Sequence, residues 1–243
     1  MTAPRATSRR RLGSPRVHLR TTGSTNAVAR ELAARGAPHG TLVTADEQTA
    51  GRGRQGRGWN APPGASLLCS WVIREPGPLL SLAAGVAVAE LAGAEASVKW
   101  PNDVLIDNRK LSGILVEGRP QEHWAVLGIG INVATALEQL PAELRDRAAT
   151  LALAPADREP TLARLRDSLE RWLSATDDEV LQAVRARDAL RGKPLRWDGG
   201  AGTGDGIDQA GRLLVALADG SHVALDAGEV HLGLDPPPTP NSR

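Results

Sequence analysis

Hydrophobic and polar positions in the first hundred residues follow the patterns of strands and helices that pack together. Short runs rich in Val, Leu, Ile and Thr at residues 17–19, 41–45 and 67–73 are typical of β-strands. An alanine-rich segment with helical character ends at Gly36, a C-cap residue type. Residues 79–92 place Leu, Val and Ala at helical spacing, which predicts a helix with one wide apolar face against a sheet.

Three further strand segments, at residues 98–106, 111–117 and 124–133, follow one another with short connections. The first of them is interrupted by a Pro-Asn-Asp turn. Asp107 and Asn108 have the chemistry of a hairpin turn, so the strands on either side are expected to pair antiparallel. Because short connections do not leave room for crossovers, we expect an antiparallel or mixed sheet.

The pattern changes in the second half of the chain. Residues 135–160 are rich in loop residues and predict only a weak helix at 142–147, whereas residues 161–190 predict an amphipathic helix in two pieces around residues 175–178. After Gly192, short strand runs alternate with turns and predict a small all-β barrel, with a flexible loop at residues 198–206. The strand runs are residues 194–197, 213–217, 222–225 and 230–232.

The charge is distributed unevenly along the chain. Residues 1–16 predict a disordered basic tail, and residues 235–243 a proline-rich tail. Of the net charge of +1, the first 20 residues contribute six arginines and no acidic residue, so residues 21–243 carry −5. A mildly acidic folded part argues against a nucleic-acid-binding domain, which needs a strongly basic face.

Cysteine usage and hydropathy favour the cytoplasm. The single Cys69 lies in an apolar run and has no partner for an internal disulfide, which fits a reducing compartment. The most apolar segment, residues 79–92, contains Ser81 and Glu90 and is too short to cross a bilayer. Residues 1–14 lack the apolar core of a secretory signal, so we expect a cytoplasmic protein with no membrane partner.

Residues 50–59, AGRGRQGRGW, contain three arginines that alternate with four glycines before a tryptophan. Glycine lets backbone approach a ligand, and arginine is a permanent cation that matches carboxylate and phosphate oxygens, so this segment predicts a mobile anion-binding loop. The glycine spacing also fits the dinucleotide fingerprint, but Pro62 and Pro63 forbid the helix that must follow it. A disordered RNA-binding tract and a solvated basic loop remain alternatives.

Other polar residues cluster near predicted strand ends and turns. Residues 24–26 are either a helix cap or part of a ligand site, and residues 99–103 are either an exposed turn or part of that site. Lysines such as Lys110 at the start of an apolar strand are usually solvated, but the small Ser112 and Gly113 leave room for a flat ligand. The sequence has no P-loop motif and no metal-ligand spacing, and its five histidines are scattered.

Five short motifs follow one another along the chain: STN at residues 24–26, QTAGRGRQGRGW at 48–59, KWPND at 99–103, KLSGIL at 110–115 and GIGINV at 128–133. In this order they resemble the biotin protein ligases, which make biotinyl-AMP and biotinylate carrier proteins. One such motif would be weak evidence, whereas five in family order with family-like separations are specific.

The resemblance implies an α+β fold. Residues 17–190 would form a catalytic domain on a mixed sheet with packed helices, similar to class II aminoacyl-tRNA synthetases and lipoate ligases, and residues 191–234 an SH3-like domain. Many relatives carry an N-terminal DNA-binding domain of roughly sixty residues. Only about sixteen residues precede the first predicted strand here, so the resemblance implies a monofunctional ligase without a repressor role or a nucleic-acid partner.

The resemblance also implies the substrates and the site residues. The substrates would be biotin and ATP with Mg²⁺, the partner a biotin carboxyl carrier protein domain, and no side chain would be a dedicated metal ligand. The catalytic residues would be Lys110 and Arg54. The biotin pocket would use Ser24, Thr25, Asn26, Gln48, Arg52, Gly53, Arg54, Lys110 and Gly113, and the nucleotide side Arg57, Trp59, Lys99, Asn102, Asp103 and Asn132.

The chemistry of such a reaction explains these residue types independently. Biotin carboxylate and ATP are both anions, so cations must bring the carboxylate oxygen close to the α-phosphorus. Lys110 is expected to contact both groups while pyrophosphate leaves, and the glycine-rich loop to fold over the hydrolysis-prone product. A lipoate or octanoate ligase of related fold, and an Arg-Gly nucleic-acid binder, remain the alternatives.

Overall fold

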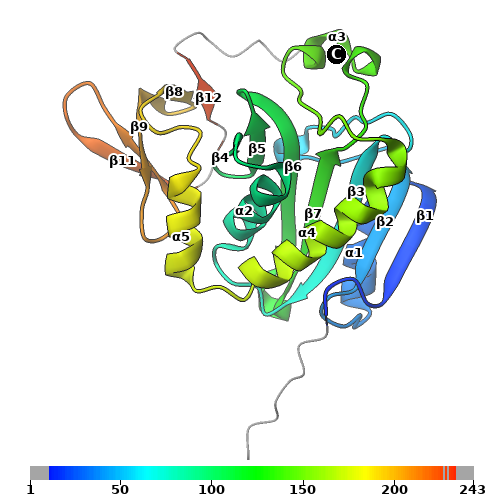
Figure 1. Ribbon diagram of the computed structural model, residues 1–243. Helices are drawn as coiled ribbons and strands as arrows, with labels where there is room; N and C mark the ends of the chain where they lie inside the picture. The colour runs from blue at the N-terminus through cyan, green and yellow to red at the C-terminus, as the bar shows by residue number, and fades with distance from the viewer. Residues whose placement is uncertain (1–10, 227, 229, 234–243) are drawn as a thin grey trace, which may run out of the picture.

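The computed structural model describes residues 11–226, 228 and 230–233. Its larger sheet has seven strands in the order β1-β2-β3-β7-β6-β5-β4 (Figure 1). β1 and β2 run parallel and every other neighbouring pair runs antiparallel, so the sheet is mixed, as predicted. The strands are β1 (Arg16–Thr22), β2 (Leu42–Gln48), β3 (Ser66–Arg74), β4 (Ala96–Lys99), β5 (Asp103–Ile106), β6 (Arg109–Arg119) and β7 (Trp124–Asn132).

The helix α1 (Thr25–Ala34) covers one face of this sheet (Figure 1). Ala29 and Ala33 are buried against Val43, Val72 and Val126, and their small side chains let the helix approach the strands closely. α1 links the parallel strands β1 and β2, which is the crossover that parallel pairing requires.

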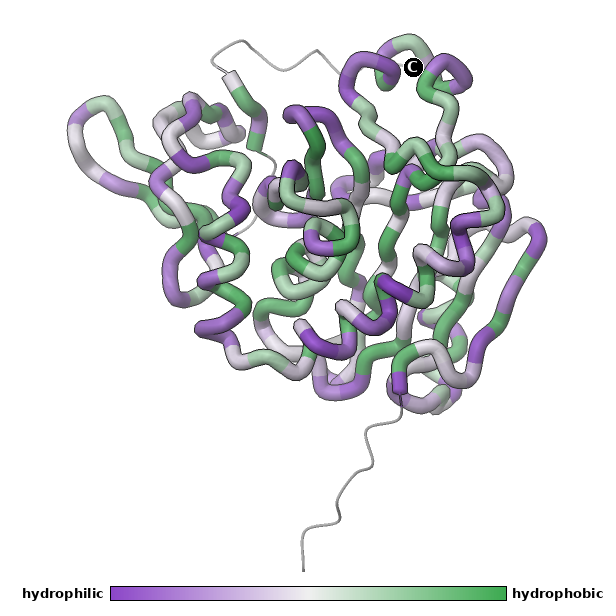
Figure 2. The backbone as a smooth tube through the Cα atoms, viewed as in Figure 1, coloured by the Kyte–Doolittle hydropathy of each residue, from purple (hydrophilic) through white to green (hydrophobic). Residues whose placement is uncertain are grey.

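The opposite face carries the main core, with α2 (Leu80–Ala92) lying on the strands and α4 (Arg158–Trp172) and α5 (Asp177–Ala186) packed beside it. The prediction of one wide apolar face for α2 is wrong, because the helix is enclosed by the sheet on one side and by α4 and α5 on the others. Only Ser81, Glu90 and Ala92 are partly exposed. Figure 2 shows the resulting hydrophobic centre along α2 and the central strands.

The predicted break between the last two helices is confirmed, and a capping box explains where α5 begins. The Thr176 hydroxyl accepts a hydrogen bond from the Glu179 backbone N–H at 3.3 Å. In return, the Glu179 carboxylate accepts one from the Thr176 backbone N–H at 2.8 Å. This reciprocal pair satisfies donors that the first turn of a helix leaves free.

A second, five-stranded antiparallel sheet lies at one side of the first, and α5 packs against both α2 and β9 (Figure 1). The predicted second β unit is therefore present, and its closure into a barrel stays a prediction. The loop predicted at residues 198–206 is wrong for most of its length, because it forms a central strand. The strands are β8 (Pro194–Trp197), β9 (Gly200–Ile207), β10 (Leu213–Ala216), β11 (His222–Leu225) and β12 (His231–Leu232).

Close backbone contacts explain why β9 is rich in glycine. A Cβ at Gly202 would lie 2.5 Å from the Ala216 carbonyl oxygen, and one at Gly204 would lie 2.2 Å from the Leu190 carbonyl oxygen. No side chain fits at such distances, so glycine here marks close approach of neighbouring segments.

The sequence predicts a disordered tail over residues 1–16, but the last part of this segment is folded. The Leu12 side chain is only 5% exposed, and its backbone N–H donates to the Glu170 carboxylate at 2.9 Å. The Gly13 backbone N–H donates to the Gly40 carbonyl at 2.8 Å. Residues 11–15 therefore belong to the folded body, while residues 1–10 and the proline-rich end at 234–243 lie outside the described residues.

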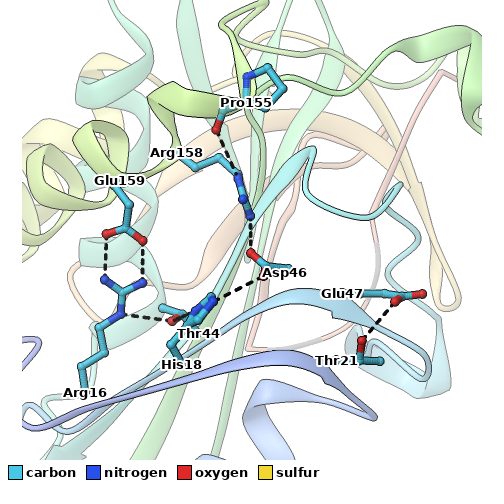
Figure 3. A network of polar contacts seen from close by, with 9 residues as sticks. All are labelled: Arg16, His18, Thr21, Thr44, Asp46, Glu47, Pro155, Arg158 and Glu159. Carbon is cyan, nitrogen blue, oxygen red and sulfur yellow. Dashed lines mark hydrogen bonds and ion pairs between the residues drawn. The ribbon is translucent and has the colours of Figure 1, made fainter.

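A polar network ties the start of α4 to the edge strand β1 and its neighbour β2 (Figure 3). Arg16 donates to both carboxylate oxygens of Glu159, at 2.7 and 2.6 Å, and to the Thr44 hydroxyl at 3.1 Å. Arg158 forms an ion pair with Asp46 at 2.9 Å. These guanidinium groups hold the pKa values of Glu159 and Asp46 below their ordinary ranges, so the network favours both carboxylates in the charged form.

Candidate functional site

A cavity of about 930 Å³ opens where the larger sheet, the Arg-Gly loop, the segment around α3 (Ala142–Arg145) and the second sheet meet. All fifteen residues that the sequence singles out for a site line it. Arg54 and Lys110, which are far apart in the sequence, lie on its wall together. The structure therefore brings the five motifs to one place.

The start of α1 forms a polar end of the cavity. Thr25 donates to the Gln48 side-chain oxygen twice, from its backbone N–H at 2.7 Å and from its hydroxyl at 2.9 Å. Ser24 occupies the N-cap position, but its side chain makes no capping hydrogen bond. Ser24, Thr25 and Asn26 are each 4% exposed. These residues therefore do not serve only as a helix cap.

Asn26 extends this polar end across the sheet. Its amide oxygen accepts a hydrogen bond from the Ser70 hydroxyl at 2.6 Å, and its amide nitrogen donates to the Glu117 carboxylate at 2.9 Å. A Cβ at Gly128 would lie 2.0 Å from the Asn26 amide oxygen, so only glycine leaves room for this side chain. Within the described residues, the Gln48 amide nitrogen makes no hydrogen bond and is free to donate to a ligand.

The Trp59 side chain covers the flat surface that the sequence predicted for a ligand. Gly113 and Gly130 are paired across β6 and β7, and an added Cβ would lie 3.1 and 2.6 Å from the indole. The Lys110 ammonium lies 5.9 Å from the ring centroid. The indole N–H is buried without a hydrogen-bond partner among the described residues. Trp59 is thus a wall of the cavity, with a donor that a ligand is able to use.

The Arg-Gly loop folds back on itself as a narrow hairpin between β2 and β3. The Trp59 backbone N–H donates to the Gly51 carbonyl at 3.0 Å, and that of Gly53 to the Arg57 carbonyl at 2.6 Å. At the tip, Gln55 has a φ of 55°, which is uncommon for a residue other than glycine. The loop therefore has a defined shape here while its tip remains exposed.

Lys110 and Arg54, two of the cationic side chains on the cavity wall, already have protein partners. The Lys110 ammonium lies 2.7 Å from Asp103 Oδ1 in an ion pair. Arg54 Nη1 donates to the Asn102 side-chain oxygen at 3.3 Å, and Asn102 Nδ2 donates to the Ile114 carbonyl at 2.8 Å. Among the residues that the structure describes, six cationic residues and two carboxylates, Asp103 and Asp198, line the cavity. It therefore favours anions, although the whole chain is nearly neutral.

Asn132 reaches the cavity wall but its amide is committed to the protein. Its Nδ2 donates to the Ala149 carbonyl at 2.9 Å, and its Oδ1 accepts from the Ser66 hydroxyl at 3.3 Å. The Ala149 backbone N–H donates to the Lys110 carbonyl at 2.8 Å, and the Lys110 N–H donates to the Arg147 carbonyl at 2.6 Å. Asn132 thus braces a segment that fixes the backbone of Lys110.

Several residues of the site have no signal in the sequence. Arg147, Asp198, His231 and Leu232 line the cavity, and Ser70 bonds to its polar end. Arg147 lies in a loop-rich stretch and Asp198 in the turn between β8 and β9. Ser70, His231 and Leu232 lie on strands, whose patterns indicate burial only. Among the described residues, no three His, Cys, Asp or Glu side chains form a group that could hold a metal ion, and no helix is long and apolar enough to span a membrane.

Known proteins resemble this chain in sequence. Residues 18–133 match the model of the biotin/lipoate A/B protein ligase family. A biotin–[acetyl-CoA-carboxylase] ligase of Mycobacterium tuberculosis is 37% identical over 232 residues, which cover 86% of this chain and 85% of that protein. A bifunctional ligase/repressor BirA of Bacillus spizizenii is 42% identical over 147 residues, which cover 56% of this chain and 45% of the relative. The chain thus spans about half the length of that relative.

The same likeness extends to solved structures. The biotin protein ligase from Aquifex aeolicus in complex with biotin and ATP superposes with a TM-score of 0.76 at 28% identity. The match covers 90% of this chain and 98% of that one.

Proposed function

This chain belongs to the biotin/lipoate A/B protein ligase family, and from that membership we propose that it activates biotin with ATP and transfers it to a carrier protein. The first product is biotinyl-5′-AMP, and the acceptor is a specific lysine of a biotin carboxyl carrier protein domain of a carboxylase. The observation that carries the proposal is the convergence of the Arg-Gly hairpin, Lys110 and the polar end at α1 on one anion-favouring cavity.

The polar end suits the ureido ring of biotin. A cyclic urea offers two N–H donors and one carbonyl acceptor. The Gln48 amide nitrogen is free to donate, and the Thr25 hydroxyl and the Asn26 amide oxygen each retain accepting capacity. Ser24 lies at the same polar end of the cavity. The valeryl carboxylate then extends towards Arg52, Gly53, Arg54, Lys110 and Gly113.

The nucleotide occupies the other part of the same cavity. Arg57, Lys99, Asn102 and Asp103 face the phosphates, and Trp59 stacks on the adenine. Asn132 acts indirectly in this arrangement, through the segment that it braces against Lys110.

Mg²⁺ bound with ATP would neutralise charge on the triphosphate. Asp103 suits this role, because Mg²⁺ typically takes one or two carboxylates together with phosphate oxygens and waters rather than a cage of side chains.

In the first step, a carboxylate oxygen of biotin attacks the α-phosphorus and the bond to the bridging oxygen of pyrophosphate breaks. Lys110 leaves Asp103 and contacts the carboxylate and a non-bridging α-phosphate oxygen, where negative charge develops. In the second step, the ε-amine of the carrier lysine attacks the acyl carbon, AMP leaves, and an amide forms. The Arg-Gly hairpin, with Arg54, covers the mixed anhydride between the steps and excludes water.

The domain assignment completes the proposal. Residues 17–190 form the catalytic domain and residues 191–234 an SH3-like domain, whose Asp198 and His231 border the cavity. The enzyme works in the cytoplasm, where its carboxylase partner and ATP are present.

Biotin-dependent exchange of labelled pyrophosphate into ATP tests the proposed function. We expect exchange with biotin and Mg·ATP, and none when lipoate or octanoate replaces biotin. Exchange with lipoate alone would instead favour the related lipoate ligases. Salt-sensitive RNA binding without exchange would favour the nucleic-acid binder, which the charge of −5 over residues 21–243 already disfavours.

A further inference from the structure

A carboxylate on β6 lies behind the polar end of the cavity without lining it. Glu117 accepts a hydrogen bond from Asn26 Nδ2 at 2.9 Å through one oxygen and forms an ion pair with Arg30 at 3.3 Å through the other. The side chains of Glu117 and Arg30 are 25% and 41% exposed, whereas Asn26 is 4% exposed. The partly exposed Arg30–Glu117 ion pair therefore contacts the buried Asn26 amide, which faces the cavity.

This contact selects one of the two orientations of the Asn26 amide. In the observed orientation, Nδ2 faces two acceptors, the Glu117 carboxylate and the Leu115 carbonyl at 3.4 Å. A half-turn of the amide would place its oxygen against both acceptors, with no proton between them. The Ser70 hydroxyl, 2.6 Å from Oδ1, is able to donate or to accept, so it does not select an orientation by itself. Glu117 therefore supplies the largest part of the preference.

The Asn26 amide also has little room to shift its position. Gly128 lies directly beneath it, since a Cβ there would be 2.0 Å from Oδ1. The hydrogen bond from Ser70 uses one lone pair of Oδ1 and leaves the second for a ligand. With Glu117 in place, the cavity thus presents a fixed acceptor at this point.

We propose that Glu117, anchored by Arg30, is a positioning residue that makes Asn26 an acceptor for a ligand N–H and thereby sets specificity for a cyclic urea head group. The inference rests on the proposed function, because the urea N–H groups of biotin are the donors that such an acceptor serves. The dithiolane ring of lipoate has no N–H group, so it gains nothing from this acceptor. The ion pair accordingly contributes to the choice between these two acids.

Steady-state pyrophosphate exchange on the full chain tests the proposal with the variant Glu117→Ala. We expect the KM for biotin to rise about tenfold, the effect of leaving a buried polar contact unmade, with kcat and the KM for ATP unchanged. If Glu117 only stabilised the fold, its removal would change the KM for ATP or kcat as well as the KM for biotin. The control Glu31→Ala removes an exposed carboxylate from the next position of α1 and is expected to leave all three constants unchanged.

Two further variants test the proposal if Glu117→Ala does not fold. Glu117→Gln has the same shape but offers a nitrogen as well as an oxygen to Asn26, so the KM for biotin is expected to rise less than in the alanine variant. Arg30→Ala frees the carboxylate from its anchor and is expected to raise the KM for biotin by a smaller factor, again without an effect on ATP.

The outcomes separate this inference from the proposed function. If the wild-type protein shows no biotin-dependent exchange, the proposed function fails. If the wild type exchanges and the folded Glu117 variants keep the wild-type KM for biotin, or lose biotin and ATP affinity equally, the positioning role is overturned while the function stands.

Discussion

At the scale of single residues, Lys110 is the side chain whose partner must change most when substrates bind. In the structure, its ammonium is paired with Asp103 at 2.7 Å and the side chain is 36% exposed. That pairing keeps a cation in the cavity without leaving it uncompensated. When anionic substrates enter, the ammonium has stronger partners, and its contact strengthens further as charge develops in the transition state.

Replacing Lys110 by Ala is therefore expected to lower kcat/KM for adenylate formation by roughly 10²–10³-fold, the usual effect of losing one stabilising donor. Biotin binding in the absence of ATP is expected to weaken far less. Pyrophosphate exchange and calorimetric titration with biotin measure the two effects. Lys193→Ala is the control, because this lysine does not line the cavity itself and only donates to Asn108 at its edge. Unchanged turnover in the Lys110 variant would remove this lysine from the mechanism.

Gly130 tests the position of Trp59. A Cβ there would lie 2.6 Å from the indole, so Gly130→Ala is expected to push Trp59 off the strands and to raise the KM for ATP several-fold. Gly77→Ala is the matched control, because nothing lies within 4 Å of the added methyl group. Wild-type kinetics in the Gly130 variant would show that the indole does not contribute to the nucleotide side.

The sequence predicts which residues reach the cavity better than it predicts what they contact there. Most of the motif residues line the cavity because they sit at a strand end, in a turn or at the start of α1, and such positions can be predicted from residue type and spacing. Ser70 and Glu117 lie within strands, where a polar residue gives no sign of the partner it meets across the sheet. Trp59 is similar, since its place over Gly113 and Gly130 depends on how the hairpin folds back.

At the scale of secondary-structure elements, hydrophobic spacing finds every strand of the larger sheet and the two-part helix after it. It fails for β9, because glycine carries no side chain and therefore contributes nothing to the alternating pattern. The glycines of β9 are needed because neighbouring backbone lies too close for a side chain. That backbone belongs to β10 and to the segment after α5, so the need for glycine arises only in the folded structure. The enclosure of α2 likewise comes from helices that fold over it later in the chain.

The packing of β9 gives a stability prediction. Gly204→Ala would place a methyl group 2.2 Å from the Leu190 carbonyl, and we expect it to lower the free energy of unfolding by about 1–3 kcal/mol through overpacking. For a chain of this size, that corresponds to a fall in Tm of roughly 2–4 °C per kcal/mol. Thermal unfolding followed by circular dichroism measures it, with Gly77→Ala as the control. A Tm equal to that of the control would contradict the close contact.

The network at the start of α4 predicts a dependence of stability on pH. Arg16 and Arg158 lower the pKa values of Glu159 and Asp46, and His18 lies 3.4 Å from Asp46. A carboxylate with a lowered folded-state pKa stabilises the protein above its unfolded pKa, and this stabilisation is lost as the pH falls through the folded value. The loss therefore begins near the ordinary values of 4.5 for Glu159 and 3.8 for Asp46 and continues below them.

Glu159→Gln isolates this contribution. At pH 7 we expect the variant to be less stable by about 0.5–1 kcal/mol, a modest value because the Glu159 side chain is 65% exposed. The difference should be smaller at pH 3, because the wild-type carboxyl becomes protonated as the pH falls below its ordinary pKa of 4.5. Denaturant unfolding at both pH values measures it, with the exposed Glu138→Gln as the control. An equal deficit at both pH values would contradict an electrostatic origin.

At the scale of the whole molecule, the cavity lies where two sheets and two loop segments meet. Parts of the chain that are distant in sequence supply its wall, among them the start of α1, the Arg-Gly hairpin, the β5–β6 region, the segment around α3 and the second sheet. Composition predicts none of this, because the chain as a whole has a net charge of only +1. The concentration of six cationic residues around one hollow arises from the topology and directs two anions towards each other.

The most direct test of biotin activation and transfer is the intact mass of a carrier domain after incubation with this protein, biotin and Mg·ATP. We predict a gain of one biotinyl group on a single lysine, which requires both biotin and ATP and is absent with the Lys110→Ala variant. A carrier domain whose mass stays unchanged under complete conditions, or one modified by lipoate and not by biotin, would contradict the proposed activity.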